Sequence, residues 1–159
     1  VATLHRPGNV DNKKNLSELI SILQAVAKLN VEVVFPMHPR TGARLREWKI
    51  STTGLTLSEP LGYLDFLKLT SHATAVLTDS GGIQEETTIL GVPCLTLRKN
   101  TERPITVTAG TNHVVGRSRR KILSAMRTAL HTPQKKLKPP KFWDGKAAAR
   151  IVQHLIKLL

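Results

Sequence analysis

Short apolar runs alternate with amphipathic stretches along most of this chain, and that alternation restricts the fold more than any other feature. The run at Glu32–Met37 (EVVFPM) precedes a helical pattern in HPRTGARLREW, and the run at Ala73–Leu77 precedes another in residues 83–90. Continuously apolar strands separated by helices are typical of βαβ units whose sheet is covered on both faces. The sequence therefore predicts an α/β fold with a mostly parallel sheet.

The remaining predicted elements follow the same periodicities. Further strands are expected at Leu55–Leu57, Val92–Leu97 and Asn112–Val115, and further helices at Asn12–Asn30, Tyr63–His72, Ser118–Leu130 and Gly145–Leu159. Asn15 and Glu18 are expected to form a capping box in the first helix. Gly91 is expected to end the helix that follows Ser80 in the left-handed conformation. The opening run VATLH is typical of a core strand with nothing before it, which indicates a piece of a longer chain.

The 159 residues fit one domain, but their net charge of +13 is unevenly placed. Residues 1–116 carry 12 Lys and Arg against 10 Asp and Glu, whereas residues 117–159 carry 12 against one. Nucleic-acid-binding folds usually interleave aromatic residues with basic ones, and the basic segment offers only Phe142 and Trp143. We favour solvated helix faces and expect no nucleic-acid partner; a nucleic-acid-binding module centred on residues 117–141 stays a remote alternative.

Neither a metal site nor a disulfide framework is predicted. The single cysteine, Cys94, lies in an apolar run and is expected to be an inert core thiol. No His-Glu-x-x-His motif and no Cys/His cluster is present. No apolar stretch approaches the length of a membrane span and the start has no secretory signal, so we expect a cytoplasmic protein without a membrane partner.

The segment LTDSGGIQEET, residues 77–87, has two contrasting interpretations. In a trypsin-like protease Ser80 is a nucleophile, but that fold is all-β, and its signature differs at Thr78 and Ile83. The α/β-hydrolase motif needs glycine where this chain has Thr78. In the other interpretation, Ser80 caps a helix while Gly81 and Gly82 let the backbone hold a phosphate at the helix start. The α/β pattern favours the phosphate site, although a simple helix cap is the competing explanation.

Four other residues are candidates for the site. Two of them, His5 and His38, are expected with the Ser80 turn at the edge of the sheet where parallel strands end. Glu86 lies about two turns into that helix, where a carboxylate accepts ribose hydroxyls or simply stabilises the helix dipole. Arg103 is a candidate phosphate clamp, or a solvated loop residue. His5 and His38 both follow apolar runs; His5 is the stronger functional candidate, and His38 is favoured as a structural hydrogen-bonding residue.

Several segments together resemble the carboxyl-terminal domain of the non-hydrolysing UDP-N-acetylglucosamine 2-epimerases. They are TLHRPGNVDN, HPRT, PLGYLDFLKL, TDSGGIQEETTILGVPCLTLR and NTERPITVTAGTNHVVG. The resemblance covers almost all of residues 3–116. It implies one Rossmann-like half of a GT-B-like enzyme that converts UDP-GlcNAc to UDP-ManNAc by eliminating and re-adding UDP. No metal and no other cofactor is implied.

The resemblance also implies roles for individual residues. Ser80, Gly81 and Gly82 would hold the diphosphate, with Arg103 on the phosphates and Glu86 on the ribose hydroxyls. His5, the catalytic candidate, would contact the diphosphate near the leaving oxygen. Phe66 and the backbone of Leu61 would line the uracil pocket.

Two departures limit what this chain does alone. Gly8 stands where the family often has Glu, and the proton-transferring carboxylates of the family lie on an amino-terminal domain that is missing here; Asp11, Asp65 and Asp79 are not obvious substitutes. Residues 1–159 are therefore expected to form one UDP-binding domain that is inactive alone, with residues 141–159 a final helix that packs on the missing domain. A homodimer is a further expected partner. The donor-binding half of a GT-B glycosyltransferase and a hydrolysing epimerase remain alternatives.

Overall fold

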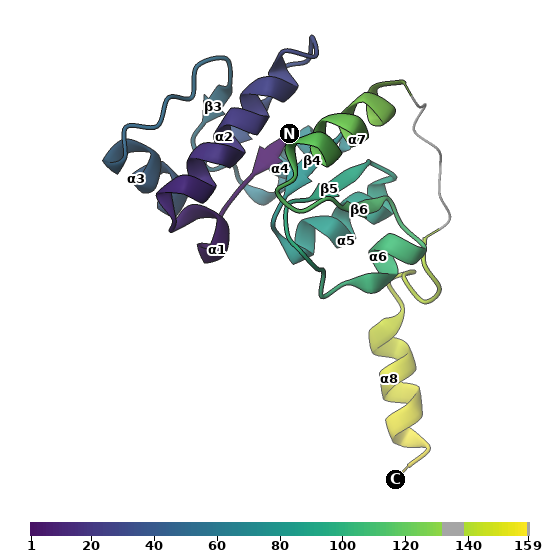
Figure 1. Ribbon diagram of the computed structural model, residues 1–159. Helices are drawn as coiled ribbons and strands as arrows, with labels where there is room; N and C mark the ends of the chain where they lie inside the picture. The colour runs from purple at the N-terminus through teal and green to yellow at the C-terminus, as the bar shows by residue number, and fades with distance from the viewer. Residues whose placement is uncertain (132–138, 159) are drawn as a thin grey trace.

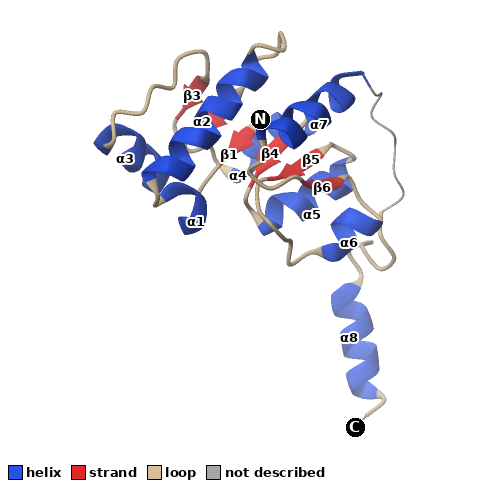
Figure 2. Ribbon diagram, viewed as in Figure 1, coloured by secondary structure: helices blue, strands red, loops and turns tan. Residues whose placement is uncertain are grey.

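The computed structural model describes residues 1–131 and 139–158, and these form the predicted α/β fold (Figures 1 and 2). The strands are β1 (Ala2–Thr3), β2 (Val34–Pro36), β3 (Thr56–Ser58), β4 (Val76–Thr78), β5 (Cys94–Thr96) and β6 (Asn112–Val114). The helices are α1 (Pro7–Val10), α2 (Lys13–Ala27), α3 (Pro39–Glu47), α4 (Tyr63–Ser71), α5 (Gly81–Leu90), α6 (Pro104–Thr108), α7 (Arg119–His131) and α8 (Ala147–Ile156).

All strand pairs are parallel. One sheet has the order β1-β4-β5-β6, and β2 pairs with β3 beside β1, so the strands succeed one another as β3-β2-β1-β4-β5-β6. Helices α2 and α7 pack against each other over one face, while α5 and α6 cover the other (Figure 1). The chain reverses its direction of travel across the sheet between β1 and β4, and ligands bind at such a switch point in doubly wound folds.

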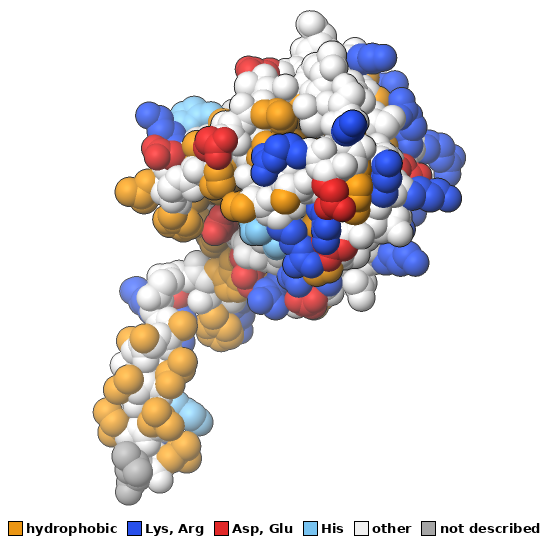
Figure 3. Space-filling view, turned by 90° about the vertical axis from the view of Figure 1, so that its left-hand side faces the viewer, with side chains coloured by type: hydrophobic (Ala, Val, Ile, Leu, Met, Phe, Trp, Pro, Cys, Tyr) orange, Lys and Arg blue, Asp and Glu red, His pale blue; other side chains and the backbone are white. Residues whose placement is uncertain are grey.

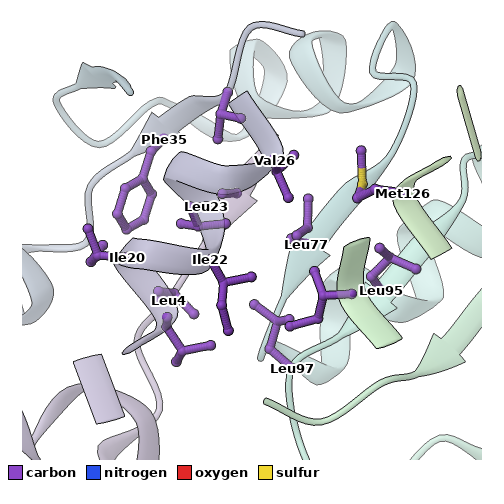
Figure 4. Packing of buried hydrophobic residues seen from close by; sticks show 14 of the residues in the cluster. Leu4, Ile20, Ile22, Leu23, Val26, Phe35, Leu77, Leu95, Leu97 and Met126 are labelled. Carbon is purple, nitrogen blue, oxygen red and sulfur yellow. The ribbon is translucent and has the colours of Figure 1, made fainter. Parts of the chain in front are cut away.

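The core lies between α2 and the sheet, and α7 closes it (Figure 4). Ile22 and Val26 lie on the side of α2 that faces Leu77 and Leu95, and every one of these side chains is at most 2% exposed (Figure 4). Each fully buried aliphatic side chain contributes about 1.5–3 kcal/mol through removal of its apolar surface from water. This packing fixes the carboxyl ends of β1, β4 and β5 relative to one another at one edge of the sheet.

Three local features depart from or confirm the sequence expectations. The capping box at Asn15 and Glu18 is wrong, because α2 begins one turn earlier, at Asn12, whose side chain accepts from the Asn15 N–H at 3.1 Å. Gly91 ends α5 in the left-handed conformation at φ 72°, as predicted. The short helices α1 and α6, each opened by a proline, were not predicted.

Cys94 is confirmed as a buried core residue. It lies on β5, and burial raises the pKa of its thiol to about 11, so the thiolate form is disfavoured at neutral pH.

Helix α8 projects away from the domain and exposes an apolar surface (Figures 1 and 3). Ile151, Val152, Leu155 and Ile156 are 53–66% exposed. The helix start is tethered by an ion pair between Arg150 and Asp144. Within the described ranges, no helix combines the length and hydrophobicity that crossing a membrane requires.

Candidate functional site

The turn after β4 leaves the start of α5 open. Ser80 is the N-cap residue, but its hydroxyl makes no capping hydrogen bond, contrary to the expectation that it caps the helix. A Cβ added at Gly82 would meet no atom within 4 Å, and one at Gly81 would lie 4.0 Å from Nη2 of Arg6. The first N–H groups of a helix lack partners within it and sit at its positive end. The start of α5 can therefore receive an anion closely against the backbone.

Asp79 joins this turn to the loop after β1. Its fully buried carboxylate accepts from the backbone N–H groups of His5 (3.1 Å) and Arg6 (3.1 Å) and from Nδ2 of Asn9 (3.0 Å). Nδ2 of Asn9 also donates to the carbonyl of Leu97 at 3.0 Å. Asp79 is thus a positioning residue that holds the ends of β1, β4 and β5 together. No local sequence pattern indicated these partners.

His5 and His38 meet at the same edge of the sheet. Their ring centroids are 5.7 Å apart, and Nδ1 of His5 lies 3.2 Å from Asp79. Burial lowers the pKa of His5 below its ordinary value; the charge of Asp79 opposes this shift, and those of His38 and Arg6 reinforce it. His38 caps α3 by accepting from the Arg40 N–H at 3.2 Å, which is the structural role favoured for it.

A buried polar network behind the turn was not predicted. Gln84 is fully buried on α5; its amide nitrogen donates to the carbonyl of Ser80 at 3.0 Å, and its oxygen accepts from Thr101 and Asn112 at 2.5 and 3.1 Å. Oγ1 of Thr101 in turn accepts from the Arg103 N–H at 2.9 Å. The network therefore fixes the Ser80 turn and the Arg103 loop relative to each other.

Arg103 and Glu86 both interact electrostatically with Glu85. Nε of Arg103 is 3.0 Å from a carboxylate oxygen of Glu85, in a geometry that makes an ion pair but no hydrogen bond. Burial and the charge of Glu85 raise the pKa of Glu86. This ion pair places Arg103 beside the first turns of α5, where its guanidinium faces the carboxylate of Glu85.

The predicted uracil residues lie on the neighbouring helix. Phe66 is half-buried on α4, which packs against α5, and Leu61 precedes α4 with 38% of its surface exposed. A hollow of about 420 Å³ beside Glu86 is lined by Tyr63 and Leu67 of α4. Neither Phe66 nor Leu61 lines it. Trp143 also lines this hollow, a contact that no local sequence signal indicates.

Comparisons with known proteins identify the family of this chain. The family model described as UDP-N-acetylglucosamine 2-epimerase matches residues 1–156. The chain belongs to the UDP-N-acetylglucosamine 2-epimerase family. It is 43% identical over 159 residues to the UDP-N-acetylglucosamine 2-epimerase of Methanocaldococcus jannaschii, a match that covers 96% of this chain and 43% of that protein. It is 37% identical to the UDP-2,3-diacetamido-2,3-dideoxy-D-glucuronate 2-epimerase of Pseudomonas aeruginosa, over 99% of this chain and 44% of that one.

Solved structures of epimerases share the fold. The crystal structure of the Methanocaldococcus jannaschii UDP-GlcNAc 2-epimerase in complex with UDP-GlcNAc and UDP matches with a TM-score of 0.88 and 42% identity, over 98% of this chain and 44% of that one. The Neisseria meningitidis UDP-GlcNAc 2-epimerase bound to UDP-GlcNAc matches with a TM-score of 0.82 and 32% identity, with the same coverage. The chain therefore spans less than half the length of these epimerase-family relatives, and its architecture is one half of their GT-B-like fold.

Proposed function

We propose that this chain is the UDP-binding half of a UDP-N-acetylglucosamine 2-epimerase. The observation that carries the proposal is the uncapped, glycine-opened start of α5, with His5 held beside it by Asp79. An anion site next to a positioned imidazole suits a diphosphate that is eliminated from the sugar and then added back to it. Family membership adds the class of nucleotide sugar.

In this proposal UDP lies along α5. The N–H groups of Gly81 and Gly82 and the hydroxyl of Ser80 bind the diphosphate, while the Ser80 N–H stays on the Thr78 hydroxyl. Arg103 leaves Glu85 to contact the diphosphate oxygens. The Glu86 carboxylate, further along the same helix, accepts the ribose hydroxyls. Phe66 and the Leu61 backbone hold the uracil from the α4 side.

The reaction that the family resemblance implies balances without an added reagent. A base removes the proton at C2 of the sugar, the C1–O bond breaks, and UDP leaves with the electron pair to give a glycal. A proton then returns to the opposite face of C2, and UDP re-forms the C1–O bond. In this chain, the approaching diphosphate favours protonated His5, whose Nε2 then donates to the leaving oxygen.

The proton transfers at C2 belong to the amino-terminal half of the parent protein, so we propose that the 159-residue domain is inactive alone. We also propose that residues 141–159 pack on that other half, since the apolar face of α8 is exposed. In the parent protein, Ile151→Asp is expected to reduce activity by loosening the two halves, whereas Gln153→Asp on the same exposed helix is not. Equal activities would reject this interface.

Calorimetric titration of the chain with UDP tests the binding site, with ADP and a short RNA as controls. Selective UDP binding is expected, and Glu86→Gln should weaken it by about 1.5–3 kcal/mol because a charge-assisted acceptor is lost. Glu18→Gln, at an exposed glutamate on α2, is the matched control and should leave the affinity unchanged. An unchanged affinity in a folded Glu86→Gln chain would exclude the ribose role, and tight RNA binding would favour the nucleic-acid alternative.

The substrate and the reaction are tested on the full-length parent. Incubation with UDP-GlcNAc is expected to yield UDP-ManNAc. Free ManNAc with UDP would indicate a hydrolysing enzyme, and sugar transfer to an acceptor a glycosyltransferase. UDP-2,3-diacetamido-2,3-dideoxy-D-glucuronate is the comparison substrate, because the Pseudomonas aeruginosa relative carries that name.

We further propose that the parent is a cytoplasmic homodimer. The lone buried thiol of Cys94 fits a reducing compartment. Cell fractionation checks the location, and light scattering of the purified parent checks the dimer; a monomeric mass would reject it.

A further inference from the structure

A second basic site lies between the loops that follow β1, β5 and β6. It is a hollow of about 340 Å³, here called the basic hollow, and its cationic lining comes from Arg6, Arg98, Lys99 and Arg117. Gly8 and Asn100 are among the uncharged residues that line it, and none of its lining residues is acidic.

Three arginine nitrogens around the basic hollow lack acceptors. Nε of Arg6, Nη1 of Arg98 and Nη1 of Arg117 are buried and have no hydrogen-bond partner among the described residues. A guanidinium stays charged at every physiological pH, and a buried charged donor without an acceptor is costly. The three nitrogens therefore call for an acceptor that the described chain does not supply.

The nearest compensating charge is insufficient. Glu102 accepts from Nη2 of Arg98 at 2.8 Å and lies 4.0 Å from Nη2 of Arg6. Hydrogen bonding to Arg98 and the charges around it hold the pKa of Glu102 below its ordinary value, so this carboxylate is ionised and already engaged. One carboxylate against four cations leaves a net positive charge at the basic hollow.

We propose that the basic hollow binds a phosphate group. Guanidinium forks match the tetrahedral oxygens of phosphate, and three forks converging from separate loops supply donors that a monovalent halide would not saturate. The basic hollow shares no residue with Ser80–Gly82 or Glu86, so its ligand is a second anion beside the proposed diphosphate. Arg6 lies between the two positions, since its Nη2 approaches Gly81.

Titration of the 159-residue chain with inorganic phosphate, followed by ¹H–¹⁵N NMR at constant ionic strength, tests the proposal. Saturable shifts are expected at the backbone amides of Gly8, Lys99 and Asn100. Arg117→Gln should weaken this binding about tenfold or more, the loss of one charge-assisted contact. Arg127→Gln removes the same charge from an exposed position on α7 outside the basic hollow and should leave binding unchanged.

A second variant guards against indirect effects of Arg117→Gln. Gly8→Asp adds a carboxylate where an added Cβ meets no atom within 4 Å, and it should abolish the shifts at Lys99 and Asn100. Titration with a hexose 1-phosphate shows which kind of phosphate the basic hollow prefers. Tighter binding of the hexose 1-phosphate than of inorganic phosphate, at the same amides, indicates a phosphate ester as the ligand, and tighter binding of inorganic phosphate indicates the free ion. Shifts confined to residues 80–83, equal binding by the two arginine variants, or no saturable shift would overturn the proposal. None of these outcomes bears on UDP binding at Glu86, which is measured separately.

Discussion

A carboxylate oxygen of Asp79 lies 3.2 Å from Nδ1 of His5, although the two residues are 74 positions apart in the chain. The same carboxylate binds the backbone N–H groups of His5 and Arg6, so it fixes both the loop and the ring. Nδ1 therefore faces Asp79, which leaves Nε2 as the ring nitrogen that we propose contacts a ligand.

Asp79→Asn should lower the pKa of His5 further, because the one charge that favours its protonation is removed while burial and the neighbouring cations remain. The pKa is measured by NMR titration of the imidazole. Asp65→Asn, at an exposed position on α4, is the control. An unchanged His5 pKa in a folded Asp79→Asn chain would show that Asp79 has no electrostatic hold on the ring.

The stability of the domain should fall as the pH drops below about 6.5. The pKa of His5 in the folded chain lies below its ordinary value of 6.5, so the unfolded chain binds the proton more readily and gains from acidification. The loss begins near 6.5 and is complete below the lowered pKa. Urea unfolding across this range should show a smaller pH dependence of stability for His5→Gln than for the unsubstituted chain. Identical pH profiles would contradict the prediction.

As the pH falls, UDP binding should begin to weaken at a higher pH than it would if Glu86 had the pKa of an ordinary glutamate. The raised pKa of Glu86 means that its carboxylate, the proposed acceptor for the ribose, is protonated at a less acidic pH than 4.5. Calorimetry measures the UDP affinity of the unsubstituted chain and of Glu86→Gln. The ratio of the first affinity to the second should decrease toward 1 on acidification. A constant ratio would mean that the ionised form of Glu86 contributes nothing to binding.

Gln84→Met should destabilise the domain by about 1–3 kcal/mol, since buried groups of Thr101, Asn112 and Ser80 lose partners while the side-chain volume is kept. Chemical denaturation measures the change. Gln153→Met, on the exposed face of α8, should alter stability by less than about 0.5 kcal/mol.

Gly110→Ala should cost about 1–3 kcal/mol through overpacking. Its Cβ would lie 2.5 Å from the backbone oxygen of Thr106 and 2.5 Å from Oγ1 of Thr88, and the backbone cannot withdraw freely. Gly62→Ala is the control, because its Cβ meets only Asp65, at 3.7 Å. Similar melting temperatures for the two variants would reject the steric argument.

Local patterns predicted most elements because their causes are local. The apolar run at 73–77 became β4 with a shift of a few residues, and Gly91 ended α5 because it tolerates positive φ. Helices α1 and α6 escaped prediction because a single proline-led turn is too short to show periodicity. The start of α2 was predicted correctly, but its cap was placed one turn too late, at Asn15, because Asn12 and Asn15 are both suitable caps.

The site was predicted in part, for a related reason. Strand ends indicated where His5 and the Ser80 turn would meet, since parallel strands end at one edge. Apart from the bond of Gln84 to Ser80, the partners of Asp79 and Gln84 depend on contacts between residues 17 to 74 positions apart, which no local pattern encodes. The ion pair between Arg103 and Glu85 likewise required the loop after β5 to be placed in space.

The position of β1 between β2 and β4 has a consequence for how the domain folds. Thr3 on β1 contacts Thr78 on β4, 75 residues later, so the central pairing closes a long loop. Closing such a loop costs entropy before its contacts form, and pairings of this kind slow folding. During synthesis, β1 must wait for β4 to emerge while its hydrogen-bonding edge remains open, so the earliest stage of folding is the one most exposed to mispairing with other chains.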